Sequence, residues 1–423
     1  MHARTPRRLV AALVVPGLLL VAPVAAASQA QRATVAGIVR APAGEPVAGV
    51  AVRSDGAATA TAADGRYQLD GLATGRHEVA FLPPAQYEST TAQVSLAEGE
   101  REQLDVVLTA AALPLVRLAG DGREETAVLA SRAGFAEGAR SVVIAAAGAF
   151  PDALAAAPLA AREGGPLLLV SRRTATAVLA EVARLGAERA VIVGAVGAVP
   201  VIVQAELERA GLQVRRIAGD GRFDTAALIA REVGAPGGEA VVASGGSFAD
   251  ALAAAPLAAA QGMPILLTAR DALPADTEAA LAALGVSRTL VVGGTQAVSE
   301  TVAAGLPGPR RVAGADRYAT AAALAALLLE RGGSPSTVAV STGRNYPDAL
   351  AAGPLVATTR GPLLLVDGAN PWIADPAYEF LAAHFAEVTQ VLVLGGEAAV
   401  APATASRVER PASAPDRPAG GGQ

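Results

Sequence analysis

The stretch FADALAAAPLAA at residues 248–259 occurs three times in this chain with small changes. The other copies are FPDALAAAPLAA at 150–161 and YPDALAAGPLVA at 346–357, and they place Asp152, Asp250 and Asp348 at one constant spacing. A constant spacing over tens of residues is typical of a repeated structural unit. The chain is therefore expected to contain three copies of one fold.

The segments around each copy recur as well. Each copy follows a related start: RLAGDGREETA from Arg117, RIAGDGRFDTA from Arg216 and RVAGADRYATA from Arg311. Each leads into an apolar run and a glycine turn, as in PILLT and VVGGTQAV of the second copy. Val, Ile and Leu runs that alternate with helical stretches predict a parallel sheet covered on both faces. We expect second-copy helices over 222–233, 250–260, 276–284 and 298–305, with Pro256 bending or ending its helix.

A different pattern fills residues 33–110. Short alternating segments such as TVAGIVR and HEVAFL are separated by Gly and Asp-Gly turns, a pattern typical of a small antiparallel β-sandwich. The strings GEPVAGVAVR, ADGRYQLDGL and TGRHEVAFLP resemble the carboxypeptidase regulatory-like family. That resemblance implies a transthyretin-like accessory module with no catalytic site of its own.

The repeated motifs carry a second resemblance. RIAGDGRFDTAALIA, ASGGSFADALAAAPLAA, PILLT and VVGGTQAVS resemble the type 2 cell wall-binding repeat of Gram-positive surface proteins. The resemblance implies three α/β repeats packed as a pseudo-threefold trimer, which bind an anionic secondary cell-wall polymer. Repeat bounds of 115–212, 213–308 and 309–408 follow, with a disordered tail at 409–423. The first repeat departs from the pattern at Ala195, where the others have Gly294 and Gly396, so it is expected to be a weaker binder or a packing unit.

The first residues predict export. Arg4, Arg7 and Arg8 precede an apolar stretch and an A-x-A site at 25–27, as in a secretory signal peptide spanning 1–27. The expected location is outside the cell, at the wall or surface of a Gram-positive bacterium, with no membrane attachment after cleavage. A formal net charge of −5, which becomes more negative when those arginines are removed, argues against a nucleic-acid partner.

Composition also argues against most enzyme classes. The 423 residues include no cysteine, no lysine and three histidines, which excludes thiolate catalysis, Schiff bases and Walker A chemistry. No G-x-S-x-G, H-E-x-x-H or dinucleotide fingerprint is present. The glycine turns at Gly194, Gly293 and Gly395 instead predict backbone positions with positive φ. We therefore expect no catalytic residue, no metal site and no cofactor.

Two sets of repeated side chains are candidates for polymer binding. The first is the aspartate at the helix start of each repeat, because ligands of open α/β sheets bind at the carboxyl ends of the strands. The alternative role for these aspartates is capping of free helix amides. The second set is an Arg-x-x-Thr pair, which lies on one helix face and could hold a phosphate or carboxylate. Its members are Arg123 and Thr126, Arg222 and Thr225, and Arg317 and Thr320.

An alternative for the arginines is structural. Each could pair with an aspartate of its own or an adjacent repeat and hold the repeats together. Three functions therefore stay open for the whole chain: a non-catalytic wall-binding anchor, which we favour; a wall-lytic hydrolase or protease anchored by the repeats; and a surface-array or adhesion protein. The partner of the β module is unknown.

Overall fold

A computed structural model describes residues 32–148, 151–171 and 176–412. The predicted signal peptide and most of the predicted tail lie outside these residues. Glu409 and the residues up to 412 are described, and the Glu409 carbonyl accepts a 2.7 Å hydrogen bond from the Leu113 amide. This bond holds Glu409 against the start of the repeat region. No helix in the described part of the chain is both long and apolar enough to cross a membrane.

The N-terminal module is a β-sandwich of two sheets, β4-β1-β7 with β8 also on β1, and β3-β2-β5-β6. Alternate side chains of the strands fill its core, including Val35, Leu69 and Phe81. The module departs from a purely antiparallel sandwich because β1 pairs in parallel with β7 and β8. Its strands are β1 (Ala33–Arg40), β2 (Ala51–Ser54), β3 (Ala57–Ala60), β4 (Arg66–Leu72), β5 (Gly75–Leu82), β6 (Thr90–Leu96), β7 (Arg101–Gln103) and β8 (Val106–Val107).

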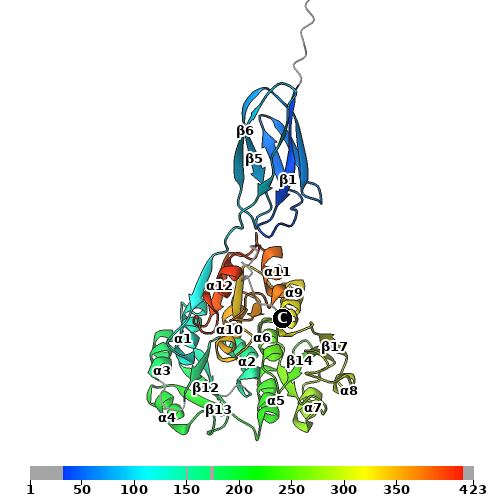
Figure 1. Ribbon diagram of the computed structural model, residues 1–423. Helices are drawn as coiled ribbons and strands as arrows, with labels where there is room; N and C mark the ends of the chain where they lie inside the picture. Colours follow the sequence, from blue (N-terminus) through cyan, green and yellow to red (C-terminus); the bar gives the residue numbers. More distant parts are fainter. Residues whose placement is uncertain (1–31, 149–150, 172–175, 413–423) are drawn as a thin grey trace, which may run out of the picture.

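The remaining residues form three α/β repeats of the same element order, which lie below the β module in Figure 1. The first contains β9 (Leu115–Leu118), α1 (Arg123–Gly134), β10 (Ser141–Ala146), η1 (Ala153–Ala155), α2 (Ala156–Glu163), β11 (Leu167–Val170), α3 (Thr176–Leu185), β12 (Arg189–Val193) and α4 (Val201–Arg209). The second contains β13 (Gln213–Ile217), α5 (Arg222–Val233), β14 (Glu239–Ser244), α6 (Ala249–Gln261), β15 (Ile265–Thr268), α7 (Ala275–Ala283), β16 (Arg288–Val292) and α8 (Glu300–Ala304). The third contains β17 (Pro309–Val312), α9 (Arg317–Glu330), β18 (Thr337–Thr342), α10 (Pro347–Ala357), β19 (Leu363–Val366), α11 (Asp375–Ala383), β20 (Gln390–Leu394) and α12 (Pro402–Glu409).

Each repeat contributes to a four-stranded parallel sheet, and the central strands are buried along their length because helices cover both faces. The sheets are not confined to single repeats. Their strand orders are β11-β10-β12-β13, β15-β14-β16-β17 and β19-β18-β20-β9. The first strand of every repeat therefore completes the sheet of another repeat, and β9 closes the ring by pairing with β20 at the other end of the chain. Within the residues that the structure describes, no repeat completes its four-stranded sheet by itself.

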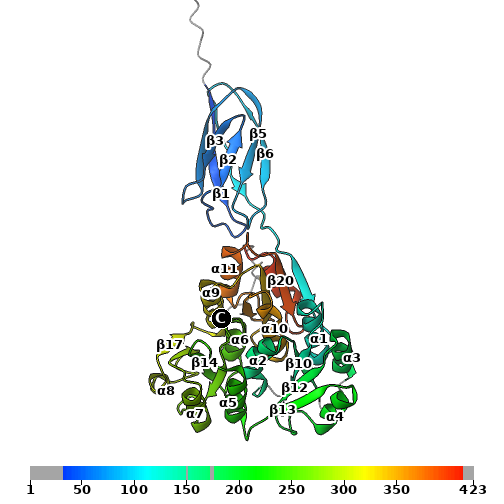
Figure 2. The ribbon, with the colours of Figure 1, turned by 180° about the vertical axis from the view of Figure 1, so that it is seen from behind.

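The Ala-rich helices α2, α6 and α10 contact one another in pairs at the centre of the ring (Figure 2). Ala157, Ala255 and Gly353 occupy equivalent positions in the three helices and meet there. A Cβ atom at Gly353 would lie 3.0 Å from the Cβ atoms of both alanines. Small side chains at this position let the three helices approach closely. One hydrophobic core runs through all three repeats, as expected for a pseudo-threefold assembly.

The central helices continue through their prolines, as the helix expected over 250–260 implies. Helix α6 continues past Pro256 to Gln261, and α10 continues past Pro354 to Ala357. Both prolines are inside the helix, where each removes one backbone hydrogen bond. Burial of the surrounding alanines and leucines against neighbouring helices outweighs that loss.

Candidate functional site

Three places in the ring bring the repeated polar residues together. We call them the repeat junctions: β12 with β13, β16 with β17, and β20 with β9. At each junction an arginine on the entering strand donates a 2.8 Å hydrogen bond to a glycine carbonyl of the preceding repeat. The pairs are Arg216 with Gly194, Arg311 with Gly293, and Arg117 with Gly395. These arginines were not among the residues predicted to bind, although each opens the repeated R-x-A-G start.

The same glycines adopt the positive φ expected for them, with values of 104°, 100° and 108° at Gly194, Gly293 and Gly395. Space is a second reason for glycine here. A Cβ atom at Gly293 would lie 2.4 Å from Oδ2 of Asp250, and the equivalent distances are 2.9 Å for Gly194 to Asp152 and 2.6 Å for Gly395 to Asp348. The glycine turn therefore leaves room for the helix-start aspartate of its own repeat.

The helix-start aspartates lie inside the junctions. Asp250 is 9% exposed, and Asp152 and Asp348 are half-buried. Burial raises the pKa of all three carboxyl groups. A residue of the following repeat opposes this shift in each case: Thr225 and Arg222 lower the pKa of Asp152, Arg317 lowers that of Asp250, and Arg123 and Thr126 lower that of Asp348.

The capping role considered for these aspartates finds no support. The residue at the N-cap of α6 is Phe248 and that of α10 is Tyr346, and no side-chain cap hydrogen bond is formed there or at the start of η1. Capping by aspartate does occur elsewhere in the third repeat. Asp316 accepts hydrogen bonds from the amides of Tyr318 and Ala319 at the start of α9. The third repeat reads G-A-D-R at this point, where the other two read G-D-G-R, so only the third repeat has an aspartate at this capping position.

The three threonines of the Arg-x-x-Thr pairs are buried, with 1% to 3% of their surface exposed. Each hydroxyl oxygen accepts a hydrogen bond from the loop that precedes its helix. The donors are the amides of Gly120 for Thr126, Gly219 for Thr225 and Gly314 for Thr320, at 3.3, 3.2 and 3.0 Å. The expectation that these hydroxyls face a ligand is therefore corrected: they lie inside the protein and hold the loop.

The paired arginines are more accessible. Arg123 and Arg317 are exposed, and Arg222 is half-buried. Each donates a hydrogen bond to the loop after the central strand of its own repeat, at Ala147, Gly343 and Gly245 respectively.

The arginine side chains also reach the neighbouring repeat. The guanidinium of Arg123 lies 5.8 Å from the ring centre of Tyr346, and that of Arg317 lies 5.7 Å from the ring centre of Phe248. Together with the effects of Arg123 and Arg317 on Asp348 and Asp250, these contacts fit the alternative in which arginines hold adjacent repeats together. The exposure of Arg123 and Arg317 leaves both able to contact a ligand as well.

A pocket opens at the carboxyl ends of the strands in the first repeat. Its volume is about 310 Å³, and Arg123, Ala147 and Ser171 contribute to its lining. The predicted binding edge is therefore not sealed by a neighbouring domain in this repeat. Among the described residues, no group of three or more His, Cys, Asp or Glu side chains is placed to hold a metal ion.

Comparisons with known protein families place two modules on the chain. The cell wall binding domain 2 (CWB2) family matches residues 117–204, 216–303 and 311–405, and the carboxypeptidase regulatory-like domain matches residues 34–109. The three CWB2 matches together span more than half of the sequence.

Two curated relatives come from Bacillus subtilis (strain 168). An N-acetylmuramoyl-L-alanine amidase, LytC, is 33% identical over 296 residues, which are 70% of this chain and 58% of the amidase. An amidase enhancer is 30% identical over 254 residues, which are 59% of this chain and 34% of that protein. The chain thus spans between a third and three-fifths of the length of these relatives.

Two solved structures share the fold. Cwp6 from Clostridium difficile aligns with a TM-score of 0.64 at 21% identity, covering 87% of this chain and 64% of Cwp6. Cwp8 from the same organism aligns with a TM-score of 0.61 at 21% identity, covering 86% of this chain and 63% of Cwp8. At this identity the likeness shows the fold alone.

Proposed function

Because the chain belongs to the cell wall binding domain 2 family, we propose that it is a cell-surface protein held on the wall non-covalently by its three repeats. The polymer bound is an anionic secondary polymer of a Gram-positive wall. The observation that carries the proposal is the ring of three equivalent junctions, each with an arginine at the carboxyl ends of the parallel strands, where ligands of such sheets bind.

In this proposal the nine junction residues have different roles. Arg123, Arg222 and Arg317 contact phosphate or carboxylate groups of the polymer, because a guanidinium forms paired hydrogen bonds with such groups. The three aspartates orient the guanidinium groups from the adjacent repeat, in keeping with the lowering of each aspartate's pKa by its arginine. The threonines fix the loop before each arginine-bearing helix.

Local charge is needed because the whole chain does not attract an anion. The formal net charge is −5, so long-range steering of a polyanion is unfavourable. The pocket beside Arg123 supplies a recess of about 310 Å³ in which one charged unit of the polymer can be held. We place the first contact there, although the first repeat is the one whose motifs depart furthest from the family.

Wall binding is tested by sedimentation of the protein with isolated walls before and after chemical removal of the secondary polymer. We expect the protein to pellet with intact walls and to stay in solution with stripped walls. Arg123→Gln with Arg317→Gln should weaken binding by about tenfold per arginine, since a hydrogen bond to a charged group is worth about 1.5–3 kcal/mol. Exposed Arg209 and Arg310, changed to Gln together, form the matched control and should bind as the parent does.

Two results would count against this proposal. Undiminished pelleting with stripped walls would show that the polymer is not the ligand. Equal loss of binding in the control pair would show that total charge, not the junction arginines, governs attachment. Thermal unfolding of each variant, measured beside the binding, separates loss of contact from loss of fold.

We further propose that the chain acts without catalysis, as an anchor or surface protein. The hydrolase alternative draws on the amidase relative, but the match covers only 58% of that protein. Release of soluble sugar or peptide from purified peptidoglycan, measured over hours against a heat-inactivated sample, tests the point. Reproducible release by the pure protein would replace the anchor with an anchored hydrolase.

A further inference from the structure

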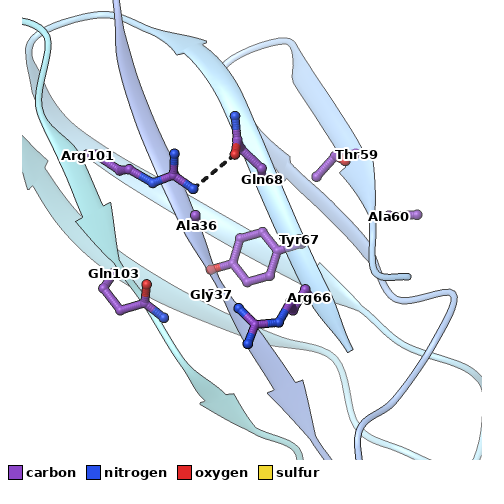
Figure 3. Close-up of a pocket in the computed structure, with 9 residues that line it drawn as sticks. All are labelled: Ala36, Gly37, Thr59, Ala60, Arg66, Tyr67, Gln68, Arg101 and Gln103. Carbon is purple, nitrogen blue, oxygen red and sulfur yellow. Dashed lines mark hydrogen bonds between the residues drawn. The ribbon is translucent and has the colours of Figure 1, made fainter. Parts of the chain in front are cut away.

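The β module carries a polar pocket of its own, far from the repeat junctions in sequence. It has a volume of about 350 Å³ and is lined by β4, β1 and β7 of one sheet and by β3 of the other, as Figure 3 shows. The lining consists of Ala36, Gly37, Thr59, Ala60, Arg66, Tyr67, Gln68, Arg101 and Gln103. Neither the family match nor the proposed wall binding of the repeats gives this pocket a role.

A small residue flanked by two amides forms the floor. Ala36 on the central strand β1 is in register with Gln68 on β4 and with Gln103 on β7. Paired residues on neighbouring strands point to the same face of a sheet. The short alanine side chain therefore leaves a depression between two longer amide side chains.

Hydrogen bonds fix the two amides before any ligand arrives. The Nε2 atom of Gln68 donates to both carboxylate oxygens of Asp70, at 2.9 and 3.0 Å, and Nε2 of Gln103 donates to Oδ1 of Asp105 at 2.7 Å. Asp70 also accepts a 2.7 Å hydrogen bond from Thr34. Side chains that are already ordered lose less conformational entropy on binding.

Asp70 is suited to holding the amide of Gln68 in place. Hydrogen bonds from Thr34 and Gln68 lower the pKa of its carboxyl group, so the carboxylate stays ionised and keeps hold of the amide. On the other side, Asp105 accepts the amide of Ile38 as well as Gln103. The same Gln-x-Asp arrangement therefore occurs on both strands that flank β1.

Two guanidinium groups complete the lining. Arg101 donates a 3.0 Å hydrogen bond to Oε1 of Gln68, drawn as a dashed line in Figure 3, and Arg66 lies on the same strand as Gln68. Both arginines are exposed. No carboxylate belongs to the lining, whose charged side chains are Arg66 and Arg101. Just outside it, Asp64 forms a 3.4 Å ion pair with Arg66, so an anionic ligand competes with that carboxylate for Arg66.

The aromatic residue of the pocket does not offer a stacking surface. Tyr67 is 5% exposed, its hydroxyl donates to the carbonyl of Leu104 at 2.8 Å, and its ring packs edge-on against Phe81. A neutral sugar, which many proteins hold by stacking on an exposed ring, lacks that contact here. Recognition has to come from charge and from hydrogen bonds.

From this geometry we propose that the pocket of the β module binds a sugar unit that carries one negative charge, with Arg66 and Arg101 on the anionic group and the two glutamines on hydroxyl groups. Guanidinium groups match carboxylates and phosphates in shape and charge, and the amide groups can both donate to and accept from hydroxyls. The β module then contributes a glycan contact separate from that of the repeats.

The test uses the ¹⁵N-labelled full-length protein and amide shifts in NMR titrations. The probes are D-glucuronate for a carboxylate source, D-glucose 6-phosphate for a phosphate source, and D-glucose as the neutral match. We expect saturable shifts at Ala36 and Gly37 with at least one charged sugar, and binding at least tenfold weaker for glucose. The charged sugar that binds more tightly identifies the source of the anion.

Two variants and one control connect the shifts to this pocket. Arg101→Gln should weaken binding by at least tenfold, and Ala36→Leu should abolish it by filling the floor without a change of charge. Arg76→Gln removes an exposed charge from β5 of the other sheet and should leave the affinity unchanged.

The proposal is overturned if no charged sugar gives saturable shifts, or if Ala36→Leu binds as the parent does. It is also overturned if acetate or inorganic phosphate binds as tightly as the matching sugar, because the hydroxyl contacts would then contribute nothing. None of these outcomes bears on wall binding by the repeats, which is measured with whole walls and with variants outside this module.

Discussion

Gly293 and Gly294 are neighbours in the chain, but the structure uses them differently. Gly293 has φ of 100° and faces Asp250 so closely that a Cβ atom would lie 2.4 Å from the carboxylate. Gly294 has nothing within 4 Å of such an atom and no positive φ. The first is therefore required by backbone conformation and by space, and the second by neither.

We expect Gly293→Ala to lower the free energy of unfolding by about 1–3 kcal/mol, the usual cost of a strained backbone position. Gly294→Ala, the matched control, should change it by less than about 0.5 kcal/mol, as surface substitutions do. Urea denaturation of both variants beside the parent measures the difference. Equal stability of the two variants would mean that the turn relaxes freely and that the junction does not depend on it.

The buried aspartates predict a dependence of stability on pH. Burial raises the pKa of Asp250, and Arg317 offsets only part of that shift. A carboxyl group with a higher pKa in the folded than in the unfolded protein stabilises the fold most below the unfolded value of about 3.9. That contribution is lost as the pH rises through the folded pKa.

Asp250→Asn removes this titration while it keeps the shape of the side chain. The difference in unfolding free energy between the variant and the parent should therefore favour the variant more at pH 7 than at pH 4. Denaturation curves of both proteins at the two pH values give the comparison. If the difference were the same at both pH values, or larger in the variant's favour at pH 4, burial would not be what sets the pKa of the Asp250 carboxyl group.

At the scale of elements, the packing of α2, α6 and α10 sets a limit on side-chain size. Ala255 is 3% exposed and faces the position of Gly353 at the centre of the ring. A larger side chain there has to push apart three helices that share one core. Ala259 lies on the same helix but is only partly buried.

We expect Ala255→Leu to destabilise the protein by about 1–3 kcal/mol, the typical cost of overpacking a core. Ala259→Leu adds the same atoms to the same helix and should cost clearly less. Thermal unfolding followed by circular dichroism separates the two. A parent-like melting temperature for Ala255→Leu would show that the three helices do not meet as closely as Gly353 indicates.

Much of the element pattern could be predicted from sequence, but its pairing could not. The helix expected over 222–233 is observed at those residues, while the one expected over 298–305 is shorter, at Glu300–Ala304. A run of apolar residues predicts a buried strand, but it does not show which sheet the strand joins. Because the three repeats have similar sequences, the strand from Gln213 to Ile217 suits either its own sheet or that of the preceding repeat.

The same ambiguity explains what could be predicted about the site. Because they recur in each copy, the repeated motifs pointed to aspartates and arginines that the structure brings near one another across the repeats. Their surroundings come from a different repeat, as Arg123 and Asp348 illustrate. Burial of Thr126 and the role of Arg117 depend on that packing. A pattern within one repeat holds no information about contacts made by another.

For the whole molecule, closure of the ring couples the two ends of the repeat region. The family resemblances recognised in the motifs are confirmed for both modules. Three tandem repeats could form either an open row or a closed ring. Here β9 pairs with β20, and the amide of Val391 donates to the carbonyl of Pro114 at 2.8 Å. The linker also packs against the third repeat through Leu113, which is 3% exposed.

Two truncations test this closure. A protein of residues 112–423 lacks the β module but keeps β9, and a protein of residues 119–423 lacks β9 as well. In the shorter protein we expect rapid hydrogen exchange at Val391, because its acceptor is gone, while Thr289, whose amide bonds Gly308 at another junction, stays protected. Both amides should stay protected in 112–423. If Val391 exchanged equally slowly in both truncations, β20 would not rely on β9, and the first repeat would close the ring by its helices alone.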